Sequence, residues 1–198
     1  LVNGAECEPY LTSDHRLMVA WPHEIVEGSL ALARVAGASR VLIGVESDKP
    51  DAIRLLCDAI DTVGPGPMQA SVVPCLARYP QGAERQLVLA VTGRTVPPRA
   101  LPAAVGVLVQ NVATALAVRD ALRERRPLLD RVVTVTGTGV REPRNLLAPL
   151  GTSLTRLVDA CGGLLDDARR LIAGGPMMGR TLARLDVPLV KGMNGLVL

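Results

Sequence analysis

Two glutamates flank a cysteine near the start of the chain, in the segment NGAECEPY at residues 3–10. The glycine and the proline of this segment favour a loop. Carboxylates such as Glu6 and Glu8 keep a surface loop soluble, or they accept hydrogen bonds from the hydroxyl and amide groups of a polar ligand. The segment alone leaves both interpretations open, and Cys7 fits either of them.

Two further polar segments, ARYPQGAER at 77–85 and QNVAT at 110–114, also follow predicted strands. Ligands of open α/β sheets bind at the carboxyl ends of the strands, and the free N–H groups of helix starts bind anions. Glu84 adds an acid to this anion-binding arrangement. A phosphate would suit the helix starts, and neighbouring ribose or ribityl hydroxyls would suit the acids. The sequence therefore predicts one shared site for a ligand that has both groups.

Metal binding and nucleophilic catalysis find little support in the residues. No two of the four cysteines have C-x-x-C spacing, which is the usual signature of zinc and iron–sulfur sites. The only histidines, His15 and His23, have no metal-ligating neighbour at short spacing, and we expect both to be structural or exposed. No histidine is obviously paired with Cys7, so we interpret it as a residue of the ligand loop and not as a nucleophile.

The composition is that of a globular protein, with 48% hydrophobic and 21% charged residues in 198. Aromatic residues make up only 2%, which argues against single-stranded nucleic acid as a partner because such binding uses aromatic stacking. The longest uncharged run, residues 100–118, contains a central Gln-Asn pair. We interpret it as a buried strand, a polar turn and a helix, and predict no transmembrane segment.

The first two thirds of the chain alternate between strand and helix patterns. Apolar strands are predicted at residues 1–4, 40–45, 69–75 and 104–110. Helices are predicted at residues 22–37, 47–64, 82–93 and 111–127. This alternation predicts a parallel sheet covered by helices.

The pattern changes after residue 127. The segment 131–140 alternates valine and threonine as a half-exposed strand does, and a short helix capped by Thr152 or Ser153 follows. We expect a small α+β module of the β-grasp type at 128–180 and a linker at 181–198. The turn GGPMMG at 174–179 is rich in glycine but lacks the G-x-G-x-x-G order of a phosphate-binding loop.

Several motifs carry a family resemblance that runs, in order, over essentially the whole chain. They are NGAECEPYLTSDHRLM, IGVESDKPDAI, YPQGAERQL, GVLVQNVAT, GGPMMG and DVPLVKGMNG. The chain resembles the C subunit of the Rnf electron transport complex and, beyond it, the flavin- and NADH-binding subunit of respiratory complex I. The resemblance implies a Rossmann-like parallel sheet with helices on both faces at 1–127, which binds FMN and NADH, and a β-grasp module called SLBB after it.

The resemblance also implies the site residues. Asn3, Glu6 and Cys7 match the family's acidic flavin loop, and Glu8 matches an acid near the nicotinamide nucleotide. The second segment for flavin and NADH is matched by Tyr79, Gly82 and Glu84, and the third, near the flavin phosphate and ribityl chain, by Gln110, Asn111 and Thr114. The implied chemistry is hydride transfer between NADH and the flavin, followed by single-electron steps.

The same resemblance implies a peripheral subunit of an ion-translocating NADH:ferredoxin oxidoreductase, on the cytoplasmic side of the cell membrane. Its partners would be the other Rnf subunits and ferredoxin or another electron carrier. The family's 4Fe-4S cluster segments and its glycine-rich flavin loop have no counterpart in these residues, so we expect the clusters in the full-length protein only and the isolated fragment to be inactive. Ser13 and His15 stand where the family usually has a cysteine and an acid.

Two alternatives stay open at this point. The chain could be a docking module of the complex with a vestigial flavin site. It could also belong to the related flavoprotein that reduces cobalamin in propanediol metabolism.

Overall fold

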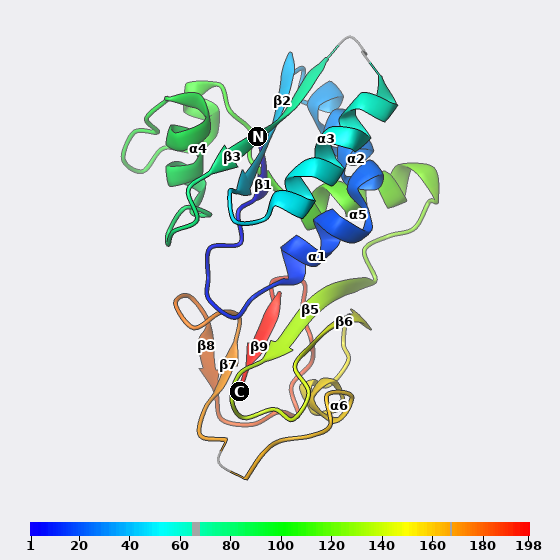
Figure 1. Cartoon of the computed structure of the whole chain (residues 1–198), viewed down its shortest axis with the longest axis vertical. Coiled ribbons are helices and arrows are strands. Elements are labelled where there is room, and N and C mark those ends of the chain that lie inside the picture. Colours follow the sequence, from blue (N-terminus) through cyan, green and yellow to red (C-terminus); the bar gives the residue numbers. More distant parts are fainter. Residues whose placement is uncertain (65–67, 167) are drawn as a thin grey trace. The chain divides into compact units, whose positions relative to one another are not determined.

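The computed structural model describes residues 1–64, 68–166 and 168–198. The chain divides into two compact units, which are described separately (Figure 1). Unit 1 comprises residues 1–7 and 17–127, and unit 2 comprises residues 8–16 and 128–198. The predicted boundary lies at residue 127, and the main segment of unit 2 begins at Leu128. The inclusion of residues 8–16 in unit 2 was not predicted.

Unit 1 is built on a parallel sheet, as the alternating pattern predicts. Its strands are β1 (Val2–Gly4), β2 (Arg40–Glu46), β3 (Gln69–Cys75) and β4 (Gln110–Asn111), in the order β3-β2-β1-β4. The two central strands are mostly buried, and β2 is apolar from Val41 to Val45, as expected where helices cover both faces of a sheet. Because all the strands are parallel, the loops after β1, β2, β3 and β4 leave the same edge of the sheet.

Local sequence signals explain the helices of unit 1. Prolines lie in the first turn of α2 (Pro22–Val35) and α3 (Pro50–Val63), where a missing N–H costs no intrahelical bond. Helix α4 (Glu84–Thr92) ends at Gly93, whose φ of 70° is the left-handed conformation that favours glycine. Figure 1 shows α4 on one face of the sheet, with α2, α3 and α5 (Val112–Arg123) on the other. The predicted α/β fold with helices on both faces is confirmed for this unit.

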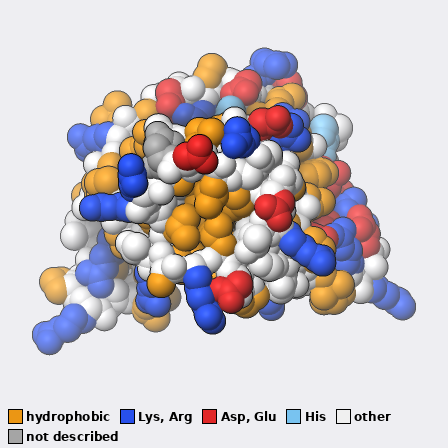
Figure 2. Space-filling model, turned by 90° about the horizontal axis from the view of Figure 1, so that it is seen from below, with side chains coloured by type: hydrophobic (Ala, Val, Ile, Leu, Met, Phe, Trp, Pro, Cys, Tyr) orange, Lys and Arg blue, Asp and Glu red, His pale blue; other side chains and the backbone are white. Residues whose placement is uncertain are grey.

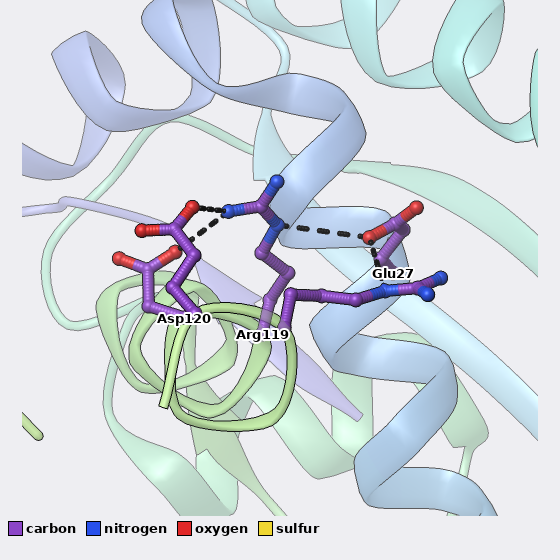
Figure 3. A network of polar contacts seen from close by, with 5 residues as sticks. Glu27, Arg119 and Asp120 are labelled. Atoms are coloured by element: carbon purple, nitrogen blue, oxygen red, sulfur yellow. Dashed lines mark hydrogen bonds and ion pairs between the residues drawn. The ribbon is translucent and has the colours of Figure 1, made fainter. Parts of the chain in front are cut away.

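Helices α2 and α5 pack unusually closely. A Cβ added to Gly28 would lie 1.9 Å from the carbonyl oxygen of Ala115, so only glycine fits at this crossing. Beside it, Glu27 accepts ion pairs from Arg119 (Nε to Oε2, 3.6 Å) and from Arg123 (Nε to Oε2, 3.5 Å), as Figure 3 shows. The basic end of α5 therefore anchors that helix to α2.

Arg119 also reaches back along its own helix. Its guanidinium forms ion pairs with Asp120, at 3.2 Å, and with Glu124 (Figure 3). The resulting network of two arginines and three acids lies at the junction of two helices, so we interpret it as structural.

One predicted strand of unit 1 is largely wrong. Instead of a strand over 104–110, the structure has a 3₁₀ helix at Pro102–Val105, and only Gln110–Asn111 pairs with β1. Pro102 opens this short helix and Gly106, with φ of 70°, ends it. The apolar composition of the segment comes from its packing beneath α4, where Val96 and Val107 join Val88 in a small core cluster.

The described residues of unit 2 include a five-stranded mixed sheet and a short helix. The elements are β5 (Asp130–Thr136), β6 (Arg144–Pro149), α6 (Leu154–Asp159), β7 (Leu171–Ala173), β8 (Arg180–Leu182) and β9 (Gly195–Val197). The strand order is β6-β5-β9-β7-β8, with β9 parallel to β5 and antiparallel to β7. Ser153 caps α6 by accepting a hydrogen bond from the N–H of Thr155, in agreement with the cap predicted at residue 152 or 153.

The structure does not have the linker expected at 181–198. Strand β9 lies at the centre of the second sheet, and Leu189 and Leu196 are buried in the core of unit 2. The sequence pattern missed β9 because a strand of three residues is too short to show a period, and only its pairing with β5 and β7 defines it. These residues complete the α+β module.

No described helix is long and apolar enough to cross a lipid bilayer. Figure 2 shows hydrophobic side chains in the middle of one face of the molecule, surrounded by charged side chains. Exposed apolar side chains in unit 2 include Leu147, Met178 and Val190. Apolar residues are therefore not confined to the core of the protein, which is usual for folded domains.

Candidate functional site

The loop after β1 begins with an asparagine that bonds to two different segments. The side-chain oxygen of Asn3 accepts a hydrogen bond from the N–H of Ala5, at 3.0 Å, and so shapes the first turn of the loop. Its side-chain nitrogen donates to the carbonyl oxygen of Gly82, at 2.9 Å. Asn3 thereby ties the loop after β1 to the loop that precedes α4.

A second asparagine joins the start of α5 to the same place. The side-chain oxygen of Asn111 accepts from the N–H of Ala113, at 2.8 Å, as an N-cap residue does. Its side-chain nitrogen donates to the carbonyl oxygen of Asn3, at 3.4 Å. The predicted place of Asn111 at the start of this helix is confirmed, and the helix start lies beside the end of β1.

Gly82 has no room for a side chain. A Cβ added to it would lie 2.2 Å from the carbonyl oxygen of Ala5 and 3.2 Å from the sulfur of Cys7. The loop after β1 and the loop before α4 therefore touch at Gly82, where only a glycine fits. Asn3, Cys7, Gly82 and Asn111, which come from three separate segments, meet at the carboxyl edge of the sheet.

The side chains of four other predicted site residues have no hydrogen bond or ion pair to this junction of Asn3, Cys7, Gly82 and Asn111 in the described part of the chain. Tyr79, Glu84 and Thr114 are exposed on the loop or helix starts that the sequence analysis singled out. Gln110 lines a cavity of about 540 Å³ together with Leu1, Arg40 and Leu108, at the amino ends of the strands. Gln110 therefore borders a cavity at the edge of the sheet opposite to the hydrogen bonds of Asn111.

Glu8 belongs to unit 2, where its carboxylate has backbone partners. One carboxylate oxygen accepts hydrogen bonds from the N–H groups of Met177, at 2.8 Å, and Met178, at 3.1 Å. These residues form the turn GGPMMG, so this glycine-rich turn binds an anion of its own chain. The expectation that Glu8 contacts a nicotinamide nucleotide stays a prediction.

A further acid, Glu46, lies at the end of β2 and was missed by the sequence analysis. It is only 4% exposed. Burial raises the pKa of its carboxyl group, and the nearby Asp48 carboxylate raises it as well. Lys49 lowers this pKa and Glu6 raises it, so the acids that follow β1 and β2 are close enough to interact. The signal in the sequence was an acid directly after a buried apolar strand.

Cys75, at the end of β3, is also affected by this acid. Burial raises the pKa of its thiol, and the charge of Glu46 raises it further. A thiol with a raised pKa is a poor nucleophile at neutral pH. The residue packs with Ala5 and Leu87 in a small core cluster, so we interpret it as structural.

Gln81 is the second residue that the sequence analysis missed. It lies in the loop between β3 and α4, next to Gly82, and is only 5% exposed. Its side-chain nitrogen is buried and has no hydrogen-bond partner among the described residues. Buried amide groups are nearly always partnered, so an unpartnered one beside three converging loops calls for an explanation.

The donors and acceptors of the junction suit an organic cofactor better than a metal. No group of three or more His, Cys, Asp or Glu side chains that could bind a metal ion occurs in the described part of the chain. The junction instead offers amides, a helix start and acids that can accept hydrogen bonds from hydroxyls. At Gly82 the two loops touch so closely that no side chain would fit between them. This set of donors and acceptors fits the phosphate, hydroxyl and amide groups of a flavin nucleotide.

Comparison with protein families matches both units. Residues 1–120 match the model of the Nuo51 FMN-binding domain, and residues 132–181 match that of the SLBB domain. Among solved structures, the chain is similar to NAD⁺-reducing [NiFe]-hydrogenase in the air-oxidized state, with a TM-score of 0.82 and 21% identity over 99% of this chain and 39% of that one. The H2-reduced state gives a TM-score of 0.80. This likeness supports the fold.

Curated relatives align with this chain over its full length. It is 40% identical to the C subunit of the proton-translocating ferredoxin:NAD(+) oxidoreductase complex of Clostridium ljungdahlii, covering 42% of that protein. It is 44% identical to the C subunit of the ion-translocating oxidoreductase complex of Rhodobacter capsulatus, covering 37%. It is 40% identical to the Na(+)-translocating counterpart of Acetobacterium woodii, covering 44%. The chain therefore spans about two fifths of the length of these relatives.

Proposed function

We propose that unit 1 binds FMN at the carboxyl edge of its parallel sheet, because this chain belongs to the Nuo51 FMN-binding domain family. The observation that carries the proposal is the pair of hydrogen bonds that join Asn3 to Gly82 and Asn111 to Asn3. These bonds bring the loop after β1, the loop before α4 and the start of α5 to one place. Ligands of open α/β sheets bind at such an edge.

Each element of the junction would have a distinct role. The start of α5, with Asn111 and Thr114, would receive the phosphate, because its N–H groups and helix dipole favour an anion. Glu6 and Glu84 would accept hydrogen bonds from ribityl or ribose hydroxyls. Asn3 and Gly82 would keep the loops at the spacing that the cofactor needs. Tyr79, Cys7 and Glu8 stay candidates for flavin or nucleotide contacts, whereas the cavity that Gln110 lines is at the other edge of the sheet.

Bound FMN would supply the redox chemistry, because a flavin accepts hydride from NADH and releases electrons one at a time. The residues of the chain would bind and orient the two nucleotides. The Glu6 carboxylate would disfavour a phosphate group placed directly beside it, so the phosphates would bind away from the loop after β1. No side chain of this chain is assigned a catalytic step, and orientation and electrostatics are its contribution.

The full-length protein, in this proposal, is the C subunit of an ion-translocating ferredoxin:NAD⁺ oxidoreductase. The basis is the identity of 40–44% to C subunits with such names, over the whole of this chain. Its 4Fe-4S clusters would lie outside these residues, and its partners would be the other subunits of the complex and ferredoxin. It would act as a peripheral subunit on the cytoplasmic side of the membrane.

The test is an FMN titration of the full-length protein, followed by flavin fluorescence. Asn111→Ser keeps an N-cap acceptor for α5 but removes the nitrogen that bonds to Asn3, and Asn3→Ala removes both of its bonds. We expect each variant to bind FMN at least tenfold more weakly, a loss of about 1.4 kcal/mol. Asn145→Ala, which changes an asparagine of unit 2, is the matched control and should bind normally.

Two results would overturn the proposal. Equal FMN affinity of all four proteins would mean that the flavin binds elsewhere. Absence of FMN binding by the wild-type protein would instead favour a docking module with a vestigial site.

A further inference from the structure

We propose that Gln81 donates a hydrogen bond from its side-chain amide to a carbonyl oxygen of the flavin ring system. This inference rests on the proposed FMN site and adds a binding residue to it. Neither the family resemblance nor the sequence pattern assigned a role to this glutamine.

The first support is the state of the side chain. Gln81 is 5% exposed, and its nitrogen is buried without a hydrogen-bond partner in the described part of the chain. A carboxamide nitrogen can only donate, so it needs an acceptor. A buried donor without an acceptor is costly to the folded protein, so the nitrogen of Gln81 calls for a partner that the described chain does not supply.

The second support is the position of Gln81 in the loop before α4. The N–H of Gln81 donates to the carbonyl oxygen of Arg78, at 2.8 Å, and the N–H of Ala83 donates to that of Pro80, at 2.9 Å. These two bonds close two successive turns of the loop before α4, and Gln81 belongs to both. The next residue, Gly82, bonds to Asn3, so the loop that holds the unpartnered amide is the one joined to the end of β1.

The charge of the surroundings indicates which part of the flavin Gln81 meets. Gly82 lies against Ala5 and Cys7, the two neighbours of Glu6, and Glu6 interacts with Glu46. A phosphate dianion next to these acids would be repelled, whereas a neutral ring carbonyl would not. The phosphate is better placed at the start of α5, and the neutral amide of Gln81 suits a ring carbonyl.

The proposal predicts that one substitution at Gln81 raises the stability of the ligand-free protein and lowers its affinity for FMN. Methionine has nearly the shape of glutamine and no donor, so Gln81→Met removes the unpartnered group without leaving a cavity. In the ligand-free full-length protein we expect the melting temperature to rise by about 2–4 °C. In the same variant we expect the affinity for FMN to fall about tenfold. A purely structural glutamine would lower both quantities on substitution.

The matched control is Gln86→Met, an exposed glutamine on α4. It should change neither the melting temperature nor the affinity. Titration with riboflavin, which lacks the phosphate, should show the same loss in Gln81→Met, because the lost bond is to the ring.

Gln81→Glu keeps the proposal testable if the methionine variant does not fold. A protonated carboxyl can donate to the ring carbonyl, whereas a carboxylate cannot. The ratio of its FMN affinity to that of the wild type should therefore rise as the pH is lowered, and the same ratio for Gln86→Glu, at the exposed control position, should not.

The outcomes are separable. If the wild-type protein binds no FMN, the proposed function fails and this inference with it. If the wild type binds FMN and Gln81→Met binds it equally well, only the role of Gln81 is overturned. A variant that loses both stability and affinity would also overturn it, since the amide would then have a structural partner.

Discussion

Two amide side chains, one in each unit, show opposite arrangements. In unit 2, Asn145 accepts a hydrogen bond from Thr134 at 2.8 Å, and its nitrogen donates to Thr12 at 2.9 Å. In unit 1, the nitrogen of Gln81 is more deeply enclosed and has no acceptor among the described residues. The amide of Asn145 is satisfied within its own unit, whereas that of Gln81 leaves a donor for a ligand.

The acids Glu8 and Glu46 also lie in different surroundings. In unit 2, Glu8 is held by the N–H groups of Met177 and Met178. In unit 1, Glu46 is buried near Asp48 and Glu6, and the raised pKa of its carboxyl reflects burial and negative neighbours. An acid that accepts backbone hydrogen bonds stabilises a fold, whereas a buried acid with a raised pKa is a candidate for a functional site.

The largest effect is expected from Gly82→Ala in unit 1. The added Cβ would lie 2.2 Å from the carbonyl oxygen of Ala5, and backbone cannot move aside cheaply. We expect a loss of about 3 kcal/mol in the free energy of unfolding and loss of FMN binding, measured by urea denaturation and flavin fluorescence.

Gly175→Ala is the control for that variant in unit 2. Its Cβ would also come within 2.2 Å of another atom, but that atom is the end of the flexible Glu8 side chain. A loss as large as that of Gly82→Ala would contradict the difference between the units.

A smaller effect is expected from Asn145→Ala. The substitution removes the acceptor of the Thr134 hydroxyl, on a residue only 3% exposed, and leaves that oxygen only the N–H of Thr12, at 3.1 Å. We expect a destabilisation of about 2 kcal/mol, because a buried donor loses its acceptor. Hydrogen exchange should show faster opening of β5 and β6, with unchanged FMN affinity. Faster opening of the loop before α4 instead would contradict the assignment of Asn145 to unit 2.

Glu8→Gln should have a smaller effect again. It leaves one carbonyl acceptor for the N–H groups of Met177 and Met178 but removes the charge, and hydrogen bonds to charged groups are the stronger ones. We expect a loss of about 1 kcal/mol and faster exchange of those two amide protons, measured by NMR. Unchanged exchange together with weaker NADH binding would show that Glu8 acts on the nucleotide and not on the turn.

The smallest effect is expected from Glu46→Gln, and it depends on pH. Because burial raises the pKa of Glu46 above its ordinary value of 4.5, the folded protein binds this proton more tightly than the unfolded chain. Stability of the wild type should therefore fall as the pH rises from 4.5 through the higher folded-state pKa. Glutamine stays neutral, so the variant should become the more stable protein over that range in urea titrations at several pH values. A difference between the two proteins that does not vary with pH would contradict the raised pKa.

Much of unit 1 could be predicted from the sequence. Continuous apolar strands, first-turn prolines and terminal glycines are local signals, and they located β2, β3, α2, α3 and α4 within a few residues. The strand predicted at 104–110 failed because apolar residues also fill the space beneath a helix. In the site, the family motif identified Asn3, Gly82 and Asn111, which the structure brings together.

By itself, the sequence determined the parallel α/β unit, the small α+β unit after it and the caps of α5 and α6, since each of these depends on neighbouring residues. Only the tertiary structure decided that β9 lies between β5 and β7, that Glu8 bonds to the turn GGPMMG, and that the nitrogen of Gln81 has no partner among the described residues. The physical reason is that pairing, enclosure and hydrogen-bond satisfaction depend on residues distant in the chain, and no local period or composition records them.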